Sequence, residues 1–96
     1  MRVCVDFTEP SSLDLFNRTY MDRMTQIIRD KISEFELLRK APPTVVMCGS
    51  DLFTVMKGAD FYGIKLEEDI TMSPWSLKIF RKEDENVHTM RSNEKD

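Results

Sequence analysis

The sequence predicts a small α+β domain, in which one long N-terminal helix packs against a sheet of three or four strands and a second, short helix follows. Three observations predict this class. Apolar side chains recur at spacings of three and four between residues 12 and 40, the run TVVMC at 44–48 is rich in β-formers without alternation, and the segments 2–7 and 75–82 alternate. The predicted order is strand, long helix, strand, short helix, strand, strand.

The length and composition fit one domain with its own core. The chain has 96 residues, of which 41% are apolar and 32% are charged. We assign residues 1–82 to this domain. Residues 83–96 are polar and have no apolar period, so we expect a flexible tail there.

The first strand is predicted at RVCVDF, residues 2–7. Its side chains alternate between an apolar face and a second face that carries Arg2, Cys4 and Asp6. Such alternation is typical of a strand with one buried face. The residues TEPSS follow, and Ser11 or Ser12 is well placed to cap the next helix.

The long helix is predicted from about Ser12 to Lys40, before Pro42 and Pro43, which cannot continue a helix. Its apolar stripe consists of Leu13, Phe16, Tyr20, Met24, Ile27, Ile28, Phe35 and Leu38. A helix of this length would measure roughly 40 Å, which exceeds the diameter of so small a domain.

The excess length leaves two alternatives. The helix bends or breaks near Asp30 and Lys31, or one end projects and packs on a partner. Lys31 lies within the stripe. Either its aliphatic stem crosses the apolar surface and its ammonium group reaches water, or it forms a salt bridge at an interface. Because the stripe is longer than a small sheet can cover, we expect a homodimer through the long helix.

The second half of the chain supplies the remaining elements. The run at 44–48 is predicted to be a buried strand, and Ser50 to cap a short helix that Gly58 ends. The segment GIKLEED at 63–69 is predicted to be a strand, and WSLKIFRK at 75–82 the last one.

The turn at Cys48 is a candidate active site, because a thiol there would precede a helix. A nucleophilic thiol needs a nearby base, and the one histidine, His88, lies in the polar tail. Asp51 would repel an anion at the helix start. We therefore predict no catalytic residue and no enzymatic activity. Cys4 and Cys48 have no metal-ligand spacing; we interpret both as small buried hydrophobes, while a disulfide stays open if their strands are neighbours.

The charge pattern disfavours nucleic acid as a partner. The net charge is −3, from 17 acidic and 14 basic side chains that are mixed along the chain. No apolar stretch could span a membrane, and MRVCVDFTEP does not resemble an export signal, so we expect a cytoplasmic protein. We predict no metal and no cofactor. The main alternative is a metal-dependent enzyme or ligand-binding domain that uses the acidic turn Glu67–Asp69, and a nucleic-acid-associated factor is the third.

Aromatic residues in the second half favour a protein partner. Phe61, Tyr62 and Trp75 lie in predicted loops or at a strand end, and aromatic side chains carry much of the energy of protein interfaces. With Lys31, these three are the predicted partner-binding residues. Core packing is the competing interpretation for each aromatic side chain.

Residues 43–82 also resemble a known arrangement. PTVVMCGSDLFTVMKG, FYGIKLEEDITM and SLKIFRK are similar to a unit of tailed-phage major capsid proteins and to small phage proteins. The resemblance covers about 40 residues and carries no functional residues. The chain is much shorter than a capsid protein and lacks its extended arm. The resemblance implies a phage or prophage origin and a role through protein contacts.

Overall fold

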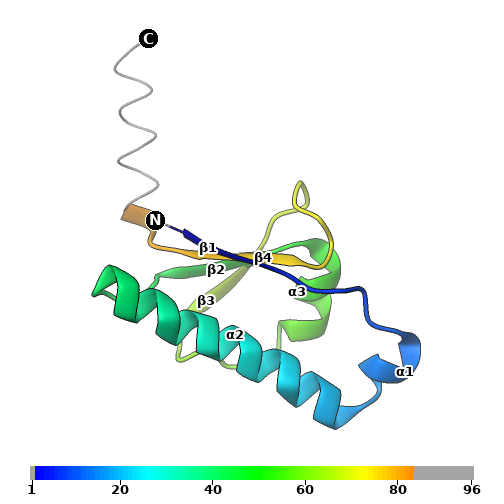
Figure 1. Cartoon of the computed structure of the whole chain (residues 1–96). Helices are drawn as coiled ribbons and strands as arrows, with labels where there is room; N and C mark the ends of the chain where they lie inside the picture. Colours follow the sequence, from blue (N-terminus) through cyan, green and yellow to red (C-terminus); the bar gives the residue numbers. More distant parts are fainter. Residues whose placement is uncertain (1, 84–96) are drawn as a thin grey trace.

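A computed structural model describes residues 2–83, which form a four-stranded mixed sheet with helices on one face (Figure 1). The elements are β1 (Arg2–Asp6), α1 (Ser12–Leu15), α2 (Arg18–Arg39), β2 (Val45–Cys48), α3 (Ser50–Met56), β3 (Lys65–Glu68) and β4 (Ser76–Phe80). The predicted α+β class is confirmed. The predicted tail lies outside the described residues, except for its first residue.

The strands are arranged in the order β1-β4-β2-β3. The last strand in the sequence, β4, lies inside the sheet and is antiparallel to both β1 and β2. Strand β3 is parallel to β2, and α3 makes the crossover between them. Within residues 2–83, β1 and β3 therefore form the two edges of the sheet.

The core lies between α2, α3 and one face of the sheet. Helix α2 contributes four buried side chains, and the inner strands and α3 contribute most of the others. The buried cluster contains Met24, Ile28, Ile32, Phe35, Val46, Cys48, Leu52, Met56, Phe61, Leu77 and Ile79. Val3 and Val5 of β1 pack against this cluster, as the alternation of the first strand predicts.

The predicted long helix is interrupted, but the predicted place of the break was wrong. Helix α2 runs without a break past Asp30 and Lys31, and the interruption lies between α1 and α2, at Phe16 and Asn17. Asn17 has an extended backbone, and its Oδ1 accepts a hydrogen bond from Tyr20 N at 3.2 Å. A side chain that caps a new helix stabilises the break, because it satisfies an amide that has no helical partner.

A shorter helix resolves the conflict between helix length and domain size. Helix α2 has 22 residues, which corresponds to about 33 Å. Its C-cap residue is Lys40, which has a left-handed backbone with φ 61° and lies two residues before Pro42.

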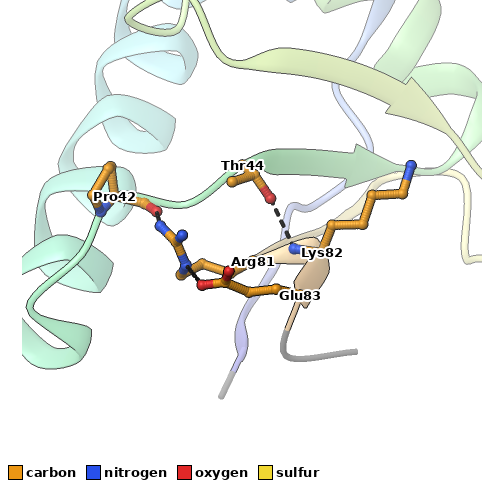
Figure 2. A network of polar contacts seen from close by, with 5 residues as sticks. All are labelled: Pro42, Thr44, Arg81, Lys82 and Glu83. Atoms are coloured by element: carbon orange, nitrogen blue, oxygen red, sulfur yellow. Dashed lines mark hydrogen bonds and ion pairs between the residues drawn. The ribbon is translucent and has the colours of Figure 1, made fainter. Parts of the chain in front are cut away.

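A polar network then joins the start of β2 to the end of β4 (Figure 2). The guanidinium group of Arg81 donates to the carbonyl of Pro42 and, at 2.7 Å, to the carboxylate of Glu83. The backbone amide of Lys82 donates to Thr44 Oγ1 at 2.8 Å. These contacts hold the segment after α2 against the neighbouring strand and so fix where β2 begins.

Candidate interaction surfaces

The corner after β2 is a packed structural element. Cys48 is fully buried, and burial, with a smaller contribution from the charge of Glu68, raises the pKa of its thiol to about 12. A thiol with such a pKa is protonated at neutral pH and is not a nucleophile.

The backbone at this corner is held by bonds to the turn before β4 and to the start of β4. Gly49, rather than the predicted Ser50, is the N-cap residue of α3. The amide of Gly49 donates to Ser76 O at 3.0 Å, and that of Leu52 donates to Pro74 O at 2.9 Å. A Cβ atom on Gly49 would lie 2.0 Å from Ser73 O, so only glycine permits this close approach. The amide of Leu52 at the start of α3 is thus occupied by the chain itself.

The two cysteines differ in environment. Cys48 is buried as predicted, but Cys4 is exposed, which corrects its interpretation as a buried hydrophobe. Cys4 lies on edge strand β1, whereas Cys48 lies on β2, and β4 separates the two strands. The two thiols point to opposite faces of the sheet, since Cys4 pairs with Lys78 and Cys48 with Leu77, and both are free.

The carboxylates of the acidic turn, Glu67–Asp69, do not converge on one site. Asp69 accepts hydrogen bonds from the amide and the hydroxyl of Thr71, at 2.9 and 2.6 Å, and the hydroxyl bond is the main cause of its lowered pKa. Glu67 and Glu68 are consecutive strand residues and point to opposite faces. Within residues 2–83, no group of three or more His, Cys, Asp or Glu side chains is placed to hold a metal ion. The geometry gives the metal-dependent alternative no site at this turn.

The four predicted partner-binding residues do not form one surface. Phe61 is buried in the core, so its interpretation as a contact residue gives way to core packing. Tyr62 follows it with a left-handed backbone and an exposed ring, 6.0 Å from the guanidinium carbon of Arg29. Arg29 also donates to Asp60 O at 3.0 and 2.8 Å, which holds this loop against α2.

Trp75 lies at the other end of the sheet, beside the end of β1. Its carbonyl accepts a hydrogen bond from Phe7 N at 2.9 Å, and the residue is half-buried. Its Nε1 is buried and has no acceptor among the atoms of the described chain. An unpaired buried donor costs stability, so this indole is a weak point of the core.

Lys31 lies on a side of α2 that the core does not cover. Its ammonium group is 3.3 Å from the carboxylate of Glu34, and both side chains are partly exposed. Ile27 and Leu38 belong to the same side and are 37% and 64% exposed. At about 100° per residue, these four residues fall within roughly 60° of one another, and we call them the α2 flank.

Two of the most exposed apolar side chains lie on α1 and directly after it. Leu13 is 82% exposed and Phe16 is 89% exposed, although both belong to the predicted core stripe. The break at Asn17 turns α1 out of line with α2, which moves these side chains away from the sheet. Sequence reasoning missed this surface; the signal for it was Asn17, a strong N-cap residue within the apolar period.

The face of the sheet opposite the helices carries charges of both signs. Arg2, Lys65 and Lys78 point to this face, and so do Asp6 and Glu67. Nucleic-acid binding is expected to need a continuous basic surface. The mixed charges do not favour it.

No family model, curated protein or solved structure matches this chain. Within residues 2–83, neither α2 nor the shorter helices combine the length and apolar character that crossing a membrane requires.

Proposed function

We propose that this chain is a non-enzymatic protein-interaction module that acts by docking on itself or on another protein. The observation that carries the proposal is the exposure of Leu13 on α1 and of Phe16 directly after it. Two large apolar side chains presented side by side in this way are typical of a contact surface.

Helix α1 has a regular, capped structure although these apolar side chains are exposed. Ser11 and Asp14 form a reciprocal capping box, in which each backbone amide donates to the other side chain at 3.1 Å. The helix is thus capped by its own polar contacts, and none of its residues is fully buried. Covering each apolar side chain with a partner would contribute about 1.5–3 kcal/mol to binding, before the cost of association.

A phage or prophage accessory role is the biological setting that we propose. The resemblance of residues 43–82 to phage proteins supports it and favours a host or virion protein as the partner. A cytoplasmic location is part of the proposal, and the two free cysteines are consistent with a reducing compartment.

Self-association is the second part of the proposal. Ile27 and Leu38 on the α2 flank support a homodimer that includes the long helix. The buried stripe of α2 is already occupied by the sheet and α3, so we place the contact on this flank.

An affinity pull-down from a host extract tests the docking surface. The full chain is compared with a Leu13→Ser/Phe16→Ser variant, which should fold normally because both side chains are exposed. We expect a protein that the original chain retains and the variant loses. Leu37→Ser is the matched control, since Leu37 is equally exposed at the far end of α2. Identical retained proteins for all three chains would contradict a role of α1.

A further inference from the structure

We propose that two copies of this chain join through the outer edge of β1, so that their two four-stranded sheets continue into one across a two-fold axis at Cys4. The inference rests on the proposed self-association and specifies its surface and register.

The hydrogen-bond pattern determines which groups β1 presents at its edge. Phe7 N donates to Trp75 O, and the same register pairs Val5 with Leu77 and Val3 with Ile79. Backbone groups of an antiparallel strand point alternately to its two sides. Those of Val3 and Val5 therefore point to β4, and those of Arg2, Cys4 and Asp6 point outward.

Within the part of the chain that the structure describes, two features that usually prevent strand pairing, a bulge and a proline, are absent from this edge. The register from Arg2 to Asp6 runs without a bulge, and the strand contains no proline. Both neighbours of Cys4 along the edge carry charge, and charges normally discourage pairing with another strand. Here their order has the opposite effect.

The sequence RVCVD is complementary to itself when it is read in the opposite direction. A two-fold axis at Cys4 places Arg2 opposite Asp6 of the second copy at both ends of the strand pair. Val3 lies opposite Val5 of the second copy, on the face that packs against the core. The three outward residues of each strand would then form about six backbone hydrogen bonds.

The α2 flank lies on the same side of the molecule as this edge. Thr25 Oγ1 lies 3.8 Å from Met56 Sδ, and Arg29 bonds to Asp60 O, so this side of α2 faces α3 and the loop after it. Helix α3 packs beside β3, at the far edge of the sheet. The flank is roughly 170° away from Thr25 and Arg29 around the helix, and it therefore faces the β1 side.

The same two-fold axis makes the two flanks complementary. An axis normal to the sheet sets the two copies of α2 antiparallel. With the centres of the two flanks opposed, between residues 32 and 33, Ile27 lies opposite Leu38 of the second copy, and Lys31 lies opposite Glu34 of the second copy. The apolar residues thus enclose a central cluster of four opposite charges.

The spacing of the sheet brings the helices within reach of each other. Helix α2 packs under β1 and β4. In the joined sheet the two β1 strands would be about 5 Å apart and the two β4 strands about 14 Å apart. Packed helices lie about 8–10 Å apart, which falls between these values. The helices are needed, because a pair of five-residue strands alone falls short of the roughly 1,000 Å² that a stable interface buries.

Sedimentation equilibrium of the full chain at tens of micromolar tests the proposal, with Cys4→Pro as the main variant. Proline at this position removes an outward amide and no bond to β4. We expect the original chain to be a dimer and Cys4→Pro to be a monomer with an unchanged circular dichroism spectrum. A dimer that persists in folded Cys4→Pro would overturn the β1 interface.

A charge exchange tests the register and does not depend on the proline variant. Asp6→Arg sets two arginines opposite each other at both ends, and we expect the dimer dissociation constant to rise about tenfold. Adding Arg2→Asp restores the opposite pairs, so the double variant should dimerise nearly as well as the original chain. Failure of the double variant to recover would exclude this register.

Cys4 itself reports on the two-fold axis. Two residues of a hydrogen-bonded antiparallel pair have Cα atoms about 5.5 Å apart, within the Cα range that a disulfide spans. Mild oxidation with diamide should yield a covalent dimer of the original chain and none of Cys4→Ser. Ser33→Cys in the Cys4→Ser background is the control, since Ser33 is exposed on the opposite side of α2. Equal cross-linking of this control would refute the contact at Cys4.

These results separate the two proposals. If the original chain dimerises and every β1 variant dimerises equally well, the proposed self-association stands and only its location at β1 is refuted. An original chain that is monomeric at every concentration refutes both, while the pull-down with α1 variants still tests docking on another protein.

Discussion

Replacing Gly49 with alanine should strongly destabilise this fold. The residue lies between β2 and α3, against the turn that precedes β4. An added Cβ would lie 2.0 Å from Ser73 O and 2.7 Å from Pro74 Cα. An ordinary contact begins at 3.4 Å, so the backbone at Ser73 would have to move by about 1.4 Å.

The size of the effect follows from the contacts that such a movement disturbs. Leu52 N donates to Pro74 O in this turn and Gly49 N donates to Ser76 O at the start of β4, and each lost bond costs about 0.5–1.5 kcal/mol. Forcing a methyl group into a packed site adds about 1–3 kcal/mol. The sum is roughly 4 kcal/mol, against a total stability of about 5–14 kcal/mol for a chain of this length.

Urea and thermal unfolding followed by circular dichroism measure this loss. We expect Tm to fall by about 15–30 °C. Gly58→Ala is the matched control, because no atom lies within 4 Å of its added Cβ, and it should be neutral or stabilise the protein by up to about 1 kcal/mol. If Gly49→Ala unfolds within about 1 kcal/mol of the original protein, the close approach does not constrain the corner.

Three further predictions follow from single groups. The Cys48 thiol has its ordinary pKa of 9.0 in the unfolded chain and a pKa of about 12 in the folded one, so the free energy of unfolding should fall by up to about 1.4 kcal/mol per pH unit above pH 9. In urea unfolding measured at several pH values, Cys48→Ala should not show this contribution to the loss of stability. Thr71→Val should raise the lowered pKa of Asp69 toward 3.8 in an NMR titration; the stability from this bond is present above that pH and is lost as pH falls through the lowered value. Trp75→Phe removes an unpaired donor and should change the unfolding free energy by less than about 1 kcal/mol, whereas Phe61→Ala should lose about 3–5 kcal/mol.

Local patterns predicted most of the elements because each depends on neighbouring residues. The alternation at residues 2–7 gives β1, the apolar run at 44–48 gives β2, and the prolines at 42 and 43 end α2. Ser11 caps α1 as expected. The predicted start of the long helix was wrong. The apolar period continues through Asn17, whereas the side-chain cap at Asn17 begins a new helix.

The candidate surfaces were harder to predict, because exposure depends on contacts between distant segments. Phe61 and Tyr62 are neighbours of similar character, yet one is in the core and the other is exposed. The left-handed backbone at Tyr62 and the bonds from Arg29 to Asp60 orient them differently. Nothing in the local pattern separates the two side chains.

The sequence by itself determined the class of the fold and the order of its strands and main helices, since these follow from periodicity and caps. Only the tertiary structure decided that β4 lies between β1 and β2, which makes β1 an edge strand and separates Cys4 from Cys48. Strand order depends on how segments far apart in the chain pack over α2. For that reason the self-complementary sequence RVCVD indicates a pairing surface only once the strand is known to lie at an edge of the sheet.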